Sequence, residues 1–181
     1  MKSRCGQCIT VQIPGIWSTE FRRARWPALF ILLLTIIGAS TGDAGAAVIF
    51  VTTLEQKISD TIPGCSLQEA IFSANFDDNI AIARYRTDDT AEFIRTDCVA
   101  GFGDDVIVLP IGAVLALRKI VDDADNPFGP TATPIIKSRI RIEAHGAVLE
   151  RTGAENFRAF AVGGGGHLTL RTAHLRGFLA K

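Results

Sequence analysis

Paired aspartates are the residues in this chain whose type and spacing come closest to supporting chemistry. They occur at Asp77-Asp78, Asp88-Asp89, Asp104-Asp105 and Asp122-Asp123, with Asp125 near the last pair. Two neighbouring carboxyl groups can supply the acid and base of glycoside chemistry, or oxygen ligands for calcium. Each pair lies beside turn-forming residues, however, where aspartate is favoured because its side chain bonds to nearby backbone. We therefore interpret the pairs as turn residues.

Other chemical motifs are absent from the sequence. His145, His167 and His174 do not have a metal-ligand spacing such as H-E-x-x-H. No G-x-S-x-G is present, and the glycine run Gly163–Gly166 is not followed by the Lys-Ser/Thr of a phosphate-binding loop. The sequence thus predicts no catalytic, cofactor-binding or metal-binding residue, and we do not expect an enzyme.

Arginines recur at positions that alternate with apolar residues in the second half of the chain. They are Arg139, Arg141, Arg158, Arg171 and Arg176. In a strand, such positions face away from the core. Two interpretations stay open: an ordinary solvated strand face, or a basic stripe that binds an acidic glycan.

The first 46 residues have the pattern of a secretory leader. Three arginines precede an apolar run from Trp26 to Ile37, and small residues follow, ending in the A-x-A site Ala44-Gly45-Ala46. A membrane anchor is the alternative, but the run is shorter than the ~20 residues that span a bilayer. We expect 1–46 to be removed and the mature chain, without a membrane span, to be secreted or held at the cell envelope.

Removal of the leader leaves a mildly acidic chain with two cysteines. Five of the 19 basic residues and two of the 19 acidic residues lie within the leader, which argues against nucleic-acid binding by the remainder. The Cys5/Cys8 pair leaves with the leader. In an oxidising compartment Cys65 and Cys98 are expected to form a disulfide, the alternative being two free thiols.

A short helix is predicted directly after Cys65. Ser66 can cap its start with Glu69 reciprocating, which is the capping-box spacing. An apolar stripe at helical spacing follows, made up of Leu67, Ala70, Ile71 and Ala74, and Asn75 is a plausible end. A helix of about ten residues is not stable alone in water. We therefore expect its stripe to cover an apolar surface to which Cys65–Cys98 fastens it.

Short strands are predicted on both sides of this helix. The segment VIFVTT from Val48 alternates like a strand, as do DDVIVLP, GAVLALRKI and the block after Ser138. Between helix and Cys98, residues 76–97 are charged and weakly periodic, and we interpret them as a surface excursion. Turn signals every eight to twelve residues suit either a sandwich or a solenoid.

The stretches CSLQEAIFSAN and DCVAGFGDDVIVLP resemble the Cys-Ser-Leu-Arg-Glu-Ala motif region of exported bacterial proteins, with Gln68 at the arginine position. Cys98, Gly101, Gly103, Asp105, Ile107, Leu109 and Pro110 follow the order of that family. The resemblance implies a mainly all-β fold, the start of a right-handed parallel β-helix whose first coil is capped by the helix. Because terminal repeats need a polar cap and the last residues lack one, we expect a truncated stack.

These observations predict two parts, a leader (1–46) and the capped β-helix (47–181). The expected function is a non-enzymatic, exported surface module, adhesin-like or glycan-binding, with a surface glycan or cell-envelope component as its partner. The alternatives are the amino-terminal piece of a polysaccharide lyase or hydrolase, or a truncated remnant without function.

Overall fold

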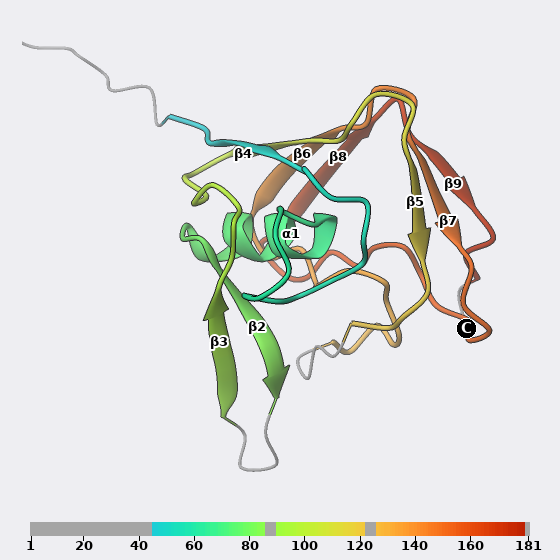
Figure 1. Cartoon of the computed structure of the whole chain (residues 1–181), viewed down its shortest axis with the longest axis horizontal. Helices are drawn as coiled ribbons and strands as arrows, with labels where there is room; N and C mark the ends of the chain where they lie inside the picture. The colour runs from blue at the N-terminus through green and yellow to red at the C-terminus, as the bar shows by residue number, and fades with distance from the viewer. Residues whose placement is uncertain (1–44, 86–89, 122–125, 180–181) are drawn as a thin grey trace, which may run out of the picture. The chain divides into compact units, whose positions relative to one another are not determined.

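The structure, a computed structural model, describes residues 45–85, 90–121 and 126–179 (Figure 1). All of them belong to one compact unit, Gly42–Lys181. The predicted leader, 1–46, lies outside the described residues except for its last two positions. In chain order the described elements are β1 (Val48–Phe50), α1 (Leu67–Phe76), β2 (Ile80–Tyr85), β3 (Ala91–Arg95), β4 (Asp105–Val108), β5 (Val114–Leu117), β6 (Arg139–Glu143), β7 (Val148–Arg151), β8 (His167–Arg171) and β9 (His174–Arg176).

Two parallel sheets form the main body of the unit. One has the strand order β1-β4-β6-β8, and the other has the order β5-β7-β9. Alternation buries one aliphatic row of the first sheet, in which Ile49, Ile107, Ile142 and Leu170 are in register. Ile49, Ile107 and Ile142 are fully buried. In the second sheet Leu115 and Leu149 are in register with each other, and both are fully buried.

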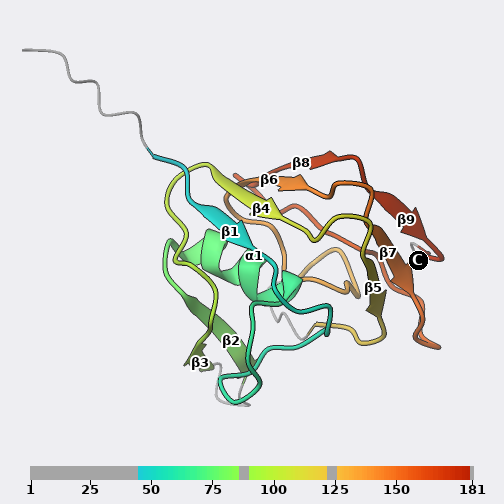
Figure 2. The same cartoon turned by 45° about the horizontal axis from the view of Figure 1, so that its top comes forward.

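Helix α1 lies inside this core (Figure 2). The predicted capping box is present: the Ser66 hydroxyl accepts from the Glu69 N–H, and Glu69 accepts from the Ser66 N–H. The helix extends through Phe76 and ends at Asp77, which has left-handed backbone angles. Asn75 therefore lies within the helix, where its side chain accepts N–H bonds from Lys137 and Ser138.

The cysteine pair closes the start of this helix onto the chain after β3. Cys65 and Cys98 are both buried and form a disulfide, with their Cα atoms 4.7 Å apart. The bond joins residues 33 positions apart. It therefore connects the first residues before α1 with the segment that leads into β4.

The predicted surface excursion, residues 76–97, includes two regular strands. These strands form the antiparallel pair β2–β3, which the sequence analysis missed (Figure 1). Ala81 and Ile82 on β2 are buried against Phe72 of α1, while Phe93 on β3 is exposed and packs edge-on against Phe76. The pair thus covers the side of α1 that the parallel sheets do not.

The predicted fold class is wrong. We expected a mainly all-β, right-handed parallel β-helix with a helix capping its first coil. The structure instead combines parallel sheets of four and three strands, an antiparallel pair and one helix. The physical reason lies in α1, which is buried at every position from Leu67 to Ala74, including Gln68, Glu69 and Ser73. A helix enclosed all round is a core element between layers and not a one-sided cap.

The disulfide gives a direct test of this packing. Replacing Cys65 with alanine (Cys65→Ala) should lower the free energy of unfolding by about 3–4 kcal/mol under oxidising conditions, because the unfolded chain loses its loop constraint. Thermal unfolding followed by circular dichroism measures the change. In reductant the variant and the wild-type chain should nearly coincide. A double variant, Cys65→Ala with Cys98→Ala, that lost twice as much as either single variant would contradict the pairing.

Candidate functional site

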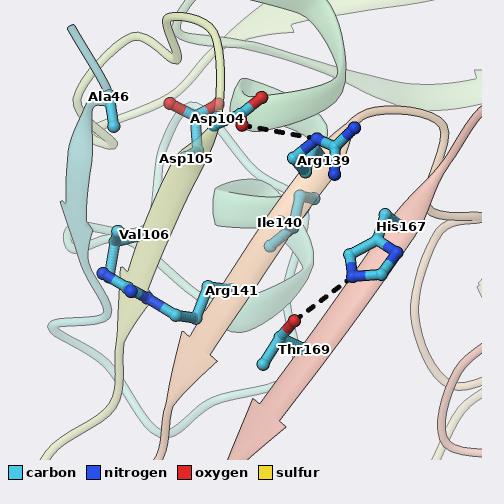
Figure 3. Close-up of a pocket in the computed structure, with 9 residues that line it drawn as sticks. All are labelled: Ala46, Asp104, Asp105, Val106, Arg139, Ile140, Arg141, His167 and Thr169. Carbon is cyan, nitrogen blue, oxygen red and sulfur yellow. Dashed lines mark hydrogen bonds and ion pairs between the residues drawn. The ribbon is translucent and has the colours of Figure 1, made fainter.

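The outer face of the four-stranded sheet carries a hollow of about 390 Å³ (Figure 3). Strand alternation directs the polar side chains that β6 and β8 contribute to it away from the core. Arg139 is in register with His167, and Arg141 with Thr169. The adjacent ends of β1 and β4 complete the wall with Ala46, Asp104, Asp105 and Val106.

The arginines on the outer face of the four-stranded sheet form exposed ion pairs. The Arg139 Nε atom lies 3.3 Å from an Asp104 oxygen, and Arg141 Nε lies 3.2 Å from Glu143 Oε1. Arg171 Nη1 shares that same Glu143 oxygen at 3.7 Å. The side chains of Arg139 and Arg141 are 62% and 48% exposed, and exposed pairs of this kind contribute only about 0–1 kcal/mol. An anionic ligand can therefore replace the partner of either arginine at small cost.

Asp105 forms the buried end of the hollow and is 1% exposed. Its Oδ1 atom accepts N–H bonds from Ala47 (3.1 Å) and Phe102 (2.9 Å), while its Oδ2 atom has no hydrogen-bond partner. Burial raises the pKa of Asp105, and the nearby carboxylates of Asp77 and Asp104 raise it further; the two N–H bonds oppose this shift. Asp105 thus ties β1 and the loop before β4 to β4 itself, but it does not present its oxygens to solvent.

The other aspartates of the four pairs lie away from the hollow or bond to the backbone of turns. Asp77 ends α1 and accepts the Gly103 N–H, and Asp78 accepts the Asn79 N–H and pairs with Arg95. Asp88-Asp89 and Asp122-Asp123, with Asp125, lie outside the described residues. The turn interpretation therefore holds for Asp77 and Asp78, and for Asp105, which accepts the N–H of Phe102 three residues before it. Asp104 and Asp105 also line the hollow.

The structure distributes the other predicted basic residues over different surfaces. His145 is exposed at a turn with positive φ, and His174 is exposed on β9 of the three-stranded sheet. Arg176 also lies on β9, and the Arg158 guanidinium donates to the Phe128 carbonyl. Only Arg139, Arg141 and Arg171 of the five arginines therefore share the outer face of the four-stranded sheet.

Lys57 is a buried partner that sequence reasoning missed. Its Nζ atom lies 2.8 Å from both carboxylate oxygens of Glu69, and the two side chains are 5% and 0% exposed. Gln68, at the motif's arginine position, donates from Nε2 to the Ala132 carbonyl. Neither contact follows from a local spacing, because both partners lie in loops that only the fold brings to α1.

The described residues contain neither a candidate metal site nor a candidate membrane-spanning helix. Among the described residues, no group of three or more histidine, cysteine, aspartate or glutamate side chains could hold a metal ion. Within the same part of the chain, no helix has the length and apolar character to cross a membrane. No family model, curated protein or solved structure matches the chain.

The raised pKa of Asp105 predicts that the free energy of unfolding depends on pH. A carboxyl whose pKa is raised in the folded state destabilises that state when it is ionised, and the penalty disappears as the pH falls through the folded pKa toward the unfolded value of 3.8. The Asp105→Asn variant retains an oxygen for both N–H bonds and carries no charge. It should therefore unfold at higher temperature than the wild-type chain at pH 7, with a difference that shrinks on acidification.

The matched control is Asp60→Asn, which removes one exposed negative charge outside the hollow. Urea unfolding at several pH values compares the two variants with the wild-type chain. The charges that act on Asp105 are those of Asp77 and Asp104, and Asp104 in turn pairs with Arg139. A constant difference between Asp105→Asn and wild type from pH 7 to pH 4 would contradict the raised pKa.

Proposed function

We propose that the chain is a non-enzymatic, exported binding module that holds a carboxylate-bearing glycan on the outer face of its four-stranded sheet. The observation that carries this proposal is the hollow in which Arg139, Arg141, His167 and Thr169 come from two adjacent strands (Figure 3). Guanidinium groups bind carboxylates through paired hydrogen bonds, and hydroxyl and imidazole groups suit sugar hydroxyls.

Three further features support export. The Cys65–Cys98 disulfide suits an oxidising compartment, and the likeness of residues 65–70 to a motif of exported bacterial proteins agrees with it. The leader pattern of 1–46 points the same way. We place the mature protein outside the cell or at its envelope, where acidic glycans are accessible partners.

The exposed arginines give the first test of glycan binding. Arg141→Gln should weaken binding of polygalacturonate about tenfold, because a hydrogen bond to a charged group contributes about 1.5–3 kcal/mol. Arg84→Gln, an exposed arginine on β2 and outside the hollow, is the control. Isothermal titration at two salt concentrations measures both, and binding should fall as salt rises. Equal binding of neutral dextran, or an unchanged affinity in Arg141→Gln, would exclude this surface as the site.

A carbohydrate-active enzyme is the second candidate, because one buried carboxyl with a raised pKa borders the hollow. Glycoside hydrolysis needs two carboxyl groups about 5–9.5 Å apart that both reach the scissile bond. Asp105 is buried and does not present its oxygens to solvent, so Asp104 and Asp105 do not form such a pair.

We therefore expect no lyase or hydrolase turnover of polygalacturonate or alginate. Release of reducing ends and absorbance of unsaturated products measure the two reactions. Turnover that disappears in Asp105→Asn would establish the enzyme and refute the binding module.

A further inference from the structure

Strands β8 and β9 are the last strands of their sheets. Among the described residues, β8 pairs only with β6 and β9 pairs only with β7 (Figure 2). The outer edge of each strand therefore carries backbone N–H and C=O groups that no other described strand pairs. Such an edge is a template for an added strand.

The aliphatic rows of the core also become exposed at this end. Leu170 is only partly buried, whereas Ile142, its register partner on β6, is fully buried. In the other sheet Leu175 is 49% exposed, while its partner Leu149 is 0% exposed. An added strand would cover Leu170 if it placed an aliphatic side chain in register with that residue.

Charge indicates which side chains such a strand should carry on its outer face. Outward residues on β8 and β9 are basic or neutral: His167, Thr169, Arg171, His174 and Arg176. On the inner neighbours, Glu143 is in register with Arg171 and Glu150 with Arg176. A strand with an acidic residue opposite Arg171 would continue this alternation of sign, and opposite charges on adjacent strands attract.

We propose that the β8 edge binds an extended segment of a partner protein in which aliphatic and acidic residues alternate. The backbone pairs with β8, the aliphatic side chains cover Leu168 and Leu170, and the acidic side chains face Arg171. A second copy of this chain fits less well. A two-fold axis would set β8 against β8, which brings the basic side chains of both strands together.

The test uses the full chain and a fluorescein-labelled synthetic peptide of sequence TEITIEG, with TKITIKG as its charge-reversed partner. Fluorescence anisotropy measures binding. The acidic peptide should bind, and Arg171→Glu should weaken it about tenfold, since a close interfacial charge pair is worth at least about 1.5 kcal/mol. The same variant should bind the lysine peptide better than wild type does.

Two controls separate this edge from other surfaces. Arg118→Glu reverses an exposed arginine just after β5, at the opposite side of the three-stranded sheet, and should leave peptide binding unchanged. Arg139→Gln alters the glycan hollow, but Arg139 pairs with Asp104 and not with the Glu143 oxygen that Arg141 and Arg171 share, so this variant should also leave peptide binding unchanged. Failure of one proposal is therefore distinguishable from failure of the other. TEITIEG with N-methyl groups on all five residues from the first glutamate to the second should not bind the wild-type chain, because neither edge of that peptide can donate N–H bonds to β8.

Three results would overturn the proposal. They are an absence of TEITIEG binding at millimolar concentration, equal binding of both peptides by the wild-type chain, and a dimer in sedimentation that TEITIEG does not dissociate. The last would assign the edge to a second copy.

Discussion

The Glu69 carboxylate is the group on which the interior of this protein depends. It accepts from the Lys57 ammonium at 2.8 Å and from the backbone N–H groups of Ser59 and Ser66 at 2.9 Å, while it is fully buried. A buried carboxylate is costly unless its oxygens are satisfied and a counter-charge lies beside it. Here one side chain caps a helix, orders the loop that precedes it and neutralises a buried lysine. The start of α1 can therefore lie in the core.

A buried α1 in turn constrains what packs around it. At the other end of α1, the loop before β4 comes close to the helix. A Cβ atom on Gly101 in this loop would lie 2.4 Å from the Ser73 carbonyl oxygen and 2.8 Å from Asp105 Oδ2. Only glycine fits there. The loop places Phe102 so that its N–H reaches Asp105, which also holds Ala47 at the start of β1. The order of β1 and β4, and with it one wall of the hollow, thus depends on how α1 is enclosed.

These dependencies explain which features the sequence could predict. The capping box and the helix after Cys65 depend on residues a few positions apart. The disulfide was predictable because only two cysteines remain after the expected leader and an oxidising compartment favours their pairing. Lys57 was missed because its contact with Glu69 requires the loop from 57 to 66 to fold back. The pair β2–β3 was missed because it buries only Ala81 and Ile82, so its alternation is weak.

The wrong fold class has the same origin. Alternation at Ile140 and Ile142 establishes that one strand face is buried, but not which elements cover it. A helix without an exposed face covers it, and an antiparallel pair covers the other side of that helix. No periodicity within the strands carries that information. The outer face was more predictable, since alternation alone places Arg139 and Arg141 outward. Their meeting with His167 and Thr169 required the register of β6 with β8.

The register of the parallel strands also separates the two proposed surfaces. On the outer face, arginines from β6 and β8 reach sideways to Asp104 and Glu143, so a ligand there competes with exposed ion pairs and meets only side chains. At the edge of β8, a ligand meets unpaired backbone and a partly covered leucine row, so its own backbone must be extended. Glu143 links the two surfaces because it contacts both Arg141 and Arg171. A ligand that withdrew Arg141 from Glu143 would leave that carboxylate to Arg171, and would thereby weaken the positive charge that an acidic strand meets at the edge.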